Sequence, residues 1–200
     1  MARLRRRVRL LGLDNITLLE QDAAALALPD GSVDVVVSNL GINNFEDREA
    51  VLRMCLRAAR PGAALLLTTN LAGHMAEFYA VYRDTLAEIG SADQLAAFKA
   101  HVEHRATAES AAALVQAAGF EVIAVIEDSF TMRFADGTAL LRHHFIRRGF
   151  LPGWKSVVEG KDAAIVFPAL ERNLNALAAA RGELSLTIPM ACIEARRPAG

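Results

Sequence analysis

Residues 22–45 read DAAALALPDGSVDVVVSNLGINNF, and this stretch decides the fold. The apolar run from Val33 is rich in β-branched residues and contains a single aspartate, a pattern typical of a strand covered on both faces in a parallel sheet. The Asp30-Gly31 pair ahead of it predicts a turn. Asparagines and a glycine follow within residues 38–44, at the carboxyl end of the strand, and ligands of open α/β sheets bind at that end. The stretch therefore predicts a buried strand that leads into a binding edge.

Composition limits the classes of protein that fit. With 200 residues, 53% of them hydrophobic, the chain can form one globular domain with a substantial core. A formal net charge of -1 provides no overall field for nucleic acid or an anionic membrane. The two cysteines, Cys55 and Cys192, lie far apart in apolar contexts and predict free thiols. Without a long apolar run or a signal peptide, we expect a cytoplasmic protein with no membrane partner, no nucleic-acid partner and no metal site.

Hydrophobic periodicity predicts alternating helices and strands. Helices are expected at residues 1–13, 46–60, 75–89, 92–105, 107–118, 139–150 and 167–181, and strands at Ile16–Glu20, Val33–Ser38, Ala63–Thr69, Phe120–Ile126 and Glu183–Ala195. Residues 128–134 are a candidate continuation of the strand at Phe120–Ile126. The order strand, helix, strand across residues 33–69 predicts a βαβ crossover and hence a parallel sheet. Pro189 predicts a break, a bulge or an edge in the last strand. The arginines of the first helix favour a solvated helix face over a nucleic-acid-binding arm.

Three segments carry a family resemblance. The first is D-A-x-x-L-x-L-P-D-G-S-V-D-V-V-V-S-N from Asp22, the second is A-R-P-G-A-x-L-L-L-T-T from Ala59, and the third is A-A-G-F at residues 117–120. In this order and spacing they resemble the class I S-adenosylmethionine-dependent methyltransferases, in particular the small-molecule branch. The resemblance implies an α/β, Rossmann-like sheet with a parallel core and a C-terminal antiparallel strand pair. It also implies S-adenosylmethionine as the cofactor and a small molecule as the methyl acceptor.

The resemblance assigns cofactor contacts to two places in the chain. By position, Asp22 accepts a hydrogen bond from the adenine amino group, and the backbone N–H of Ala23 faces the ring. The segment Asn39, Leu40 and Gly41 passes the methionine moiety and the transferable methyl group. The residues alone leave a second interpretation of Asp22 open, which is a loop aspartate that caps the turn after it.

Candidates for the acceptor side are less specific. Asn43 and Asn44 could reach the acceptor or provide turn and N-cap chemistry before the helix at Glu46. His74 is the candidate general base if the acceptor must lose a proton, or else caps the helix that begins at Met75. Tyr79 could line the acceptor pocket or belong to the core. Trp154 could be a lid or a packing residue, and the Arg142 to Arg148 cluster could bind an anion or form a solvated face. By the resemblance, substrate choice resides in residues 71–105 and 142–155.

The chain departs from the family at its beginning. It contains no strand leading into a G-x-G-x-G loop and no second strand ending in the acidic residue that holds the ribose. We therefore expect an N-terminally truncated single domain, 1–200, with a partial cofactor-binding half at 1–70 and a helical acceptor region followed by the last strands at 71–200. The strand Val33–Ser38 would then be an unpaired edge that self-associates or pairs with Ile16–Glu20. The alternative function is a non-catalytic remnant or a partner subunit that completes a methyltransferase-like complex.

Overall fold

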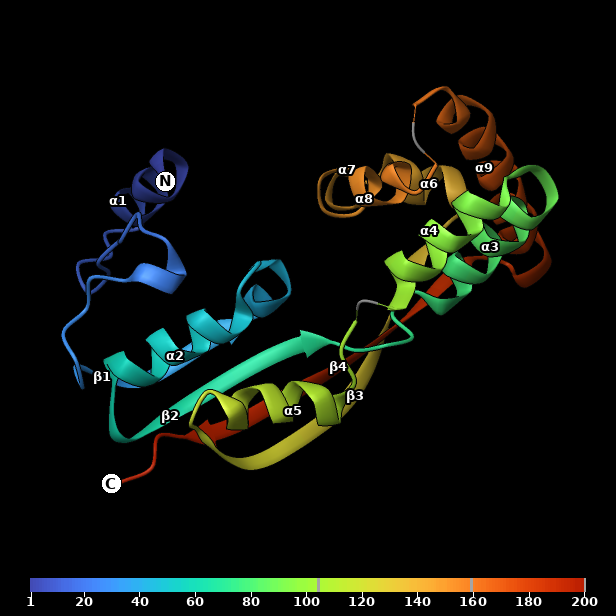
Figure 1. Ribbon diagram of the computed structural model, residues 1–200. Coiled ribbons are helices and arrows are strands. Elements are labelled where there is room, and N and C mark those ends of the chain that lie inside the picture. The colour runs from blue at the N-terminus through green and yellow to red at the C-terminus, as the bar shows by residue number, and fades with distance from the viewer. Residues whose placement is uncertain (104, 159, 200) are drawn as a thin grey trace.

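The computed structural model describes residues 1–103, 105–158 and 160–199, and it shows a four-stranded sheet joined to a helical lobe (Figure 1). The sheet order is β1-β2-β4-β3; β1 and β2 are parallel, and β4 is antiparallel to both of its neighbours. The strands are β1 Val33–Asn39, β2 Ala59–Asn70, β3 Glu121–Phe134 and β4 Leu184–Arg196. The helices are α1 Ala2–Leu10, α2 Arg48–Ala58, α3 Ala76–Ile89, α4 Ala92–Glu103, α5 Ala108–Ala117, α6 Gly137–Arg142, α7 His144–Gly149, α8 Leu151–Ser156 and α9 Ala163–Arg181, with short 3₁₀ turns η1 Ala23–Ala25, η2 Gly41–Asn44 and η3 Gly160–Asp162. The predicted mixed α/β sheet with its C-terminal antiparallel pair is confirmed.

One face of the sheet is covered by α2 and α5. The apolar stripes of these helices pack against alternate strand residues, because neighbouring strand positions point to opposite faces. This core contains Leu52, Ala111, Val115, Leu65, Leu67 and Ile193. α2 begins at Arg48 rather than Glu46, after the Asp47 carboxylate caps the Ala50 N–H at 2.8 Å.

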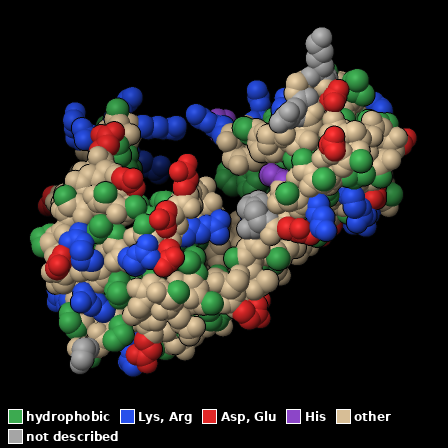
Figure 2. Space-filling model, viewed as in Figure 1, with side chains coloured by type: hydrophobic (Ala, Val, Ile, Leu, Met, Phe, Trp, Pro, Cys, Tyr) green, Lys and Arg blue, Asp and Glu red, His purple; other side chains and the backbone are tan. Residues whose placement is uncertain are grey.

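The helical lobe has a core of its own. α3, α4 and α6–α9 surround large buried side chains that include Phe78, Tyr82, Trp154, Leu170 and Leu174. The first half of β4 belongs to this core and its second half to the sheet core, so the strand joins the two parts. In Figure 1, β3 and β4 run from the sheet into the lobe, and Figure 2 shows a hollow between the lobe and the part of the chain around α1.

The expectation that the valine strand is covered on both faces is wrong. β1 lies at the end of the sheet, and Val35 and Val37 are 53% and 67% exposed. They point away from α2 and α5, on the face that also exposes Leu66, the partner of Val37 in β2. Among the described residues no strand pairs with the outer edge of β1, so the expected unpaired edge is confirmed.

Ile16–Glu20 is not a strand, which corrects the sequence-based expectation. The segment pairs with no described strand, and Ile16 and Leu19 are each 43% exposed. An apolar alternation forms a strand only where a neighbouring strand completes the hydrogen-bond ladder, and no described strand lies beside this segment.

Residues 139–150 also differ from the single helix expected, because His143 is extended with ψ 132° and separates α6 from α7.

Pro189 was expected to mark a break or an edge, yet β4 is a central strand. β2 ends opposite Met190, so the missing N–H of Pro189 lies just beyond the ladder. On that same side, the Pro189 carbonyl accepts from the Leu71 N–H at 2.9 Å, and the Glu77 carboxylate accepts from the Thr187 N–H at 2.9 Å. A central strand therefore tolerates the proline here.

Both cysteines are free thiols, as predicted, and burial raises the pKa of Cys55. Within the described part of the chain, no helix has the length and apolar character that crossing a membrane requires.

Candidate functional site at the strand ends

β1 ends in a tight turn that is fixed by β2. The Leu40 N–H donates to the Thr68 carbonyl at 3.2 Å and to its hydroxyl at 3.0 Å, while that hydroxyl donates to Asn39 Oδ1 at 2.7 Å. Leu40 adopts a left-handed conformation with φ 57°, a strained state for a side chain with a Cβ. At Gly41 an added Cβ would lie 2.8 Å from Ser38 Oγ, so the turn is close enough to favour glycine. The turn carries the chain from the sheet edge into η2.

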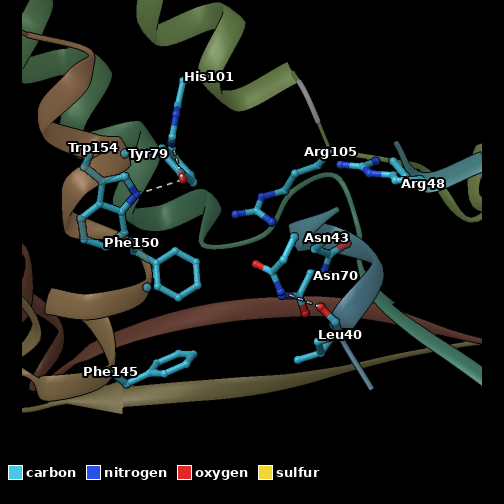
Figure 3. Close-up of a pocket in the computed structure, with 14 residues that line it drawn as sticks. Leu40, Asn43, Arg48, Asn70, Tyr79, His101, Arg105, Phe145, Phe150 and Trp154 are labelled. Carbon is cyan, nitrogen blue, oxygen red and sulfur yellow. Dashed lines mark hydrogen bonds between the residues drawn. The ribbon is translucent and has the colours of Figure 1, made fainter. Parts of the chain in front are cut away.

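A cavity of about 310 Å³ opens at this turn, and it is called the site cavity below. Figure 3 shows its polar floor at the strand ends and its aromatic wall on the helical lobe. The floor comes from η2 and the end of β2, and the wall from α3, α4 and the α7–α8 region. Its lining residues are Leu40, Asn43, Asn44, Arg48, Asn70, Tyr79, His101, Arg105, Ala106, Phe145, Gly149, Phe150, Gly153 and Trp154.

The floor of the site cavity carries side-chain amides. Asn43 Oδ1 accepts from the Thr69 hydroxyl at 2.6 Å, and Asn44 Nδ2 donates to the Leu40 carbonyl at 3.3 Å. Neither asparagine caps α2, since Asp47 does so, and the N-cap interpretation is wrong. Asn70 Oδ1 is buried and has no hydrogen-bond partner among the described residues. A buried acceptor without a donor is costly, so Asn70 is ready to accept from a ligand.

The wall contains a chain of three aromatic polar groups. Trp154 Nε1 donates to the Tyr79 hydroxyl at 3.1 Å, and that hydroxyl lies 3.3 Å from His101 Nε2. When the His101 proton is on Nδ1, the Tyr79 hydroxyl donates to Nε2, which gives a path for a proton at the cavity surface. Trp154 is fully buried and stacks on Phe78, so it is a packing residue that also forms part of the wall.

His74 does not line the site cavity. It lies in a neighbouring cavity of about 210 Å³ with Arg105 and stacks on Phe150, with ring centroids 5.6 Å apart. Its imidazole is only 3% exposed, and neither nitrogen has a hydrogen-bond partner among the described residues. It does not cap α3, so that alternative is wrong. Burial, with a smaller contribution from the Arg105 charge, lowers the pKa of His74 to about 4, which keeps it neutral at physiological pH.

Asp22 and Ala23 lie outside the site cavity, on the loop that precedes β1. Asp22 Oδ1 accepts from the Ala24 N–H at 2.9 Å and caps η1, as the second interpretation expected. Arg57 of α2 fixes the loop by donating to the carbonyls of Leu26 and Leu28, both at 2.8 Å. The Asp22 carboxylate is exposed and keeps acceptor capacity for a ligand.

The sequence indicated part of this cavity. Leu40, Asn43, Asn44 and Tyr79 line it, as does Trp154, and both segments to which substrate choice was assigned contribute residues. Arg48, His101 and Arg105 were not singled out. No local pattern could identify them, because they come from the start of α2, from α4 and from the segment after α4.

Comparison with known proteins supports the family resemblance. Residues 1–67 match the methyltransferase domain family. The chain is 34% identical over 64 residues to the ubiquinone/menaquinone biosynthesis C-methyltransferase of Pasteurella multocida, which is 32% of this chain and 24% of that protein. It is 37% identical over 79 residues to the demethylmenaquinone methyltransferase of Thermus thermophilus, which is 40% of this chain and 36% of that protein. The chain thus spans about a quarter to a third of these curated relatives.

The fold likeness extends further than the sequence likeness. A solved structure from Bacillus halodurans, assigned as a methyltransferase, superposes with a TM-score of 0.59 at 16% identity. The likeness covers 97% of this chain and 77% of that one, and at this identity it shows the fold alone. Residues 1–67 are thus similar to the methyltransferase domain family, and nearly the whole chain shares its fold with a solved structure assigned as a methyltransferase.

Proposed function

We propose that this protein transfers a methyl group from S-adenosylmethionine to a small-molecule acceptor held in the site cavity. The position of that cavity supports the proposal, because it opens at the strand-end turn of Leu40 and is closed on the far side by the helical lobe. The two curated relatives described above are named for methylation of quinone precursors, which are small molecules. Ligands of open α/β sheets bind at this edge.

The residues present fit part of the cofactor. Leu40 of the strand-end turn lines the cavity, and Asn70 Oδ1 is an acceptor without a donor among the described residues. In the proposed arrangement, Asn39, Leu40 and Gly41 pass the methionine end, and Asp22 and Ala23 contact the adenine. The G-x-G-x-G loop and the ribose-binding acid are not among these 200 residues, so we expect weak cofactor binding by this chain.

The acceptor is held by Asn43, Asn44 and Tyr79 in this proposal. Methyl transfer from a sulfonium is an in-line displacement, and holding the acceptor close to the methyl group provides much of the catalysis. A base is needed only when the acceptor loses a proton. Tyr79, hydrogen-bonded to His101 at the cavity surface, is better placed for that proton than His74, which lies in the neighbouring cavity.

Calorimetry with S-adenosylhomocysteine tests the cofactor assignment. We expect measurable binding that Asp22→Ala weakens by about tenfold, because it removes a hydrogen bond from a charged acceptor. Asp47→Ala is the matched control: it also removes an N-cap carboxylate, from α2, and costs about 1 kcal/mol of stability. Absence of binding even at the solubility limit of the nucleoside, or equal losses in the two variants, would contradict the proposal.

The alternative of a partner subunit is favoured by a separate observation, which is the free edge and open face of β1. Val35, Val37 and Leu66 are exposed together on this face, and such an edge is a template for strand pairing. In this alternative a chain that supplies the glycine-rich loop completes the complex, and the edge Val33–Asn39 is available for pairing with such a chain or with a second copy of this one. A protein that acts alone as a methyltransferase does not require this contact.

Size-exclusion chromatography with light scattering tests the pairing. We expect concentration-dependent dimers of the natural chain and a monomer for Val37→Lys, because a lysine on an edge strand opposes pairing. The control is Ile165→Lys, which places the same charge at a residue of α9 that is 64% exposed, comparable to the 67% of Val37. A natural chain that stays monomeric with a cooperative melting transition would rule the pairing out.

A further inference from the structure

Two arginines from distant parts of the sequence meet at the site cavity. Arg48 is the first residue of α2, and Arg105 follows α4. Both line the site cavity, and both also line a third cavity of about 360 Å³ beside it. Figure 3 shows both side chains above Asn43, with Arg48 pointing toward the backbone of Arg105 and the Arg105 guanidinium group pointing toward the aromatic wall. The two arginines therefore line the same two cavities.

The structure shows no described carboxylate partner for either guanidinium group: none pairs with Arg48 or Arg105, whereas Arg53 pairs with Glu49 and Arg133 with Glu183. Among the described residues, no aspartate or glutamate lines either of the two cavities that the arginines share. Two like charges at one partly enclosed space repel each other unless an anion lies between them.

The carboxylates nearest Arg48 in the sequence have other partners. Asp47 caps the Ala50 N–H of α2, and Glu49 pairs with Arg53. The Arg48 guanidinium group therefore remains available to an anion in the cavity.

The opposite wall of the site cavity is aromatic. Phe145, Phe150 and Trp154 line it together with Tyr79. Flat apolar side chains of this kind pack well against an aromatic or extended apolar body. The cavity thus has a cationic end at the arginines and an apolar end at the lobe (Figure 3).

We propose that Arg48 and Arg105 bind an anionic group, a carboxylate or a phosphate, on an acceptor whose apolar or aromatic body packs against Phe150 and Trp154. The inference rests on the proposed function in that it takes this cavity as the acceptor site. A guanidinium group pairs with either oxyanion through two parallel hydrogen bonds, so the chemistry of recognition is the same for both. The neutral amides of Asn43 and Asn70 can complete the contacts of the bound oxygens.

Trp154 provides a direct readout. It is the only tryptophan of the chain and lies in the cavity wall, so its fluorescence reports on ligands that enter the cavity. The probes are benzoate and phenyl phosphate, with benzamide as the neutral compound of the same shape. We expect saturable changes with both anions, weaker binding of benzamide, and weaker anion binding as salt is raised. A higher affinity for one anion distinguishes a carboxylate site from a phosphate site.

Arg48→Gln and Arg105→Gln should each weaken benzoate and phenyl phosphate binding by about tenfold or more and leave benzamide unchanged. The control is Arg53→Gln, on the same helix, whose partner Glu49 lies outside the cavity. If a glutamine variant melts early, the corresponding lysine variant retains the charge and should bind with intermediate affinity. Equal anion binding by the natural chain and both glutamine variants would overturn the inference.

Saturating S-adenosylhomocysteine separates this inference from the proposed function. If the arginines hold the acceptor, benzoate still binds when the nucleoside is present. Competition between the two would instead assign the arginines to the cofactor carboxylate and overturn the inference. Arginine-dependent benzoate binding in a chain that does not bind the nucleoside would keep the inference and remove the proposed methyl transfer.

Discussion

The Trp154→Ala variant is expected to lose about 3–5 kcal/mol of unfolding free energy, the range for removing a fully buried aromatic side chain. Trp154 stacks on Phe78 with ring centroids 3.9 Å apart and donates from Nε1 to Tyr79. Its backbone carbonyl also accepts from the Tyr82 hydroxyl at 2.8 Å, which fixes α8 on α3. Removing the indole leaves a cavity in the core of the helical lobe and takes one of its two hydrogen-bond partners from the Tyr79 hydroxyl.

Urea unfolding followed by circular dichroism measures this loss without relying on tryptophan fluorescence. Trp154→Phe should lose less, because it keeps the stacked ring and gives up the hydrogen bond. Phe145→Ala is the control, since Phe145 lines the same cavity but is 52% exposed and should cost little. A Trp154→Ala variant as stable as Phe145→Ala would show that the lobe core does not depend on the indole.

The second large effect is an acid-dependent loss of stability that His74 causes. Its pKa is about 4 in the folded protein, compared with an ordinary value of 6.5, so between these values the unfolded chain binds a proton that the folded chain does not. The contribution of His74 to stability is therefore fully present above pH 6.5 and is lost as the pH falls toward 4. With one pKa unit worth about 1.36 kcal/mol, the loss at pH 4 is about 3 kcal/mol.

His74→Leu removes this titration and should flatten the decline in unfolding free energy between pH 6.5 and 4. At neutral pH the variant should be as stable as the natural chain or more so, because it replaces a buried imidazole that has no hydrogen-bond partner among the described residues. Glu77 also contributes to the acid dependence of stability: burial acts to raise its pKa, but hydrogen bonds from Thr187 hold the pKa below its usual value. This contribution is the same in the natural chain and in the His74→Leu variant. His144→Leu, at an exposed position in α7, is the control. An unchanged pH profile in His74→Leu would contradict the prediction.

Val33–Ser38 and Ile16–Glu20 were both predicted as strands, and only the first is a strand in the structure. Both segments alternate or accumulate apolar residues, yet only Val33–Asn39 found a partner, in β2. A strand depends on a neighbour that may lie far away in the sequence, whereas a helix completes its hydrogen bonds within itself. This is why the helices near 75–89 and 107–118 agree with the structure to within a residue or two.

The same reason explains which parts of the cavity the sequence could indicate. Leu40, Asn43 and Asn44 follow a recognisable strand, and the rule that ligands bind at strand ends applied to them directly. Arg48 and Arg105 belong to helix-forming segments in which an arginine is ordinary. Whether they pair with a carboxylate depends on what folding places beside them, and no residue spacing expresses that.

Most of the helices and the parallel β1–β2 unit could be predicted from the sequence, because apolar periodicity and turn residues act over a few positions. The family resemblance came from three motif segments in order. Tertiary contacts leave one face of β1 open and allow Pro189 to lie in a central strand. They also bury His74 without a hydrogen-bond partner among the described residues, and they bring two arginines that pair with no described carboxylate to an aromatic cavity. Burial and charge pairing are set by contacts between segments that are distant in the chain, and those contacts exist only once the chain has folded.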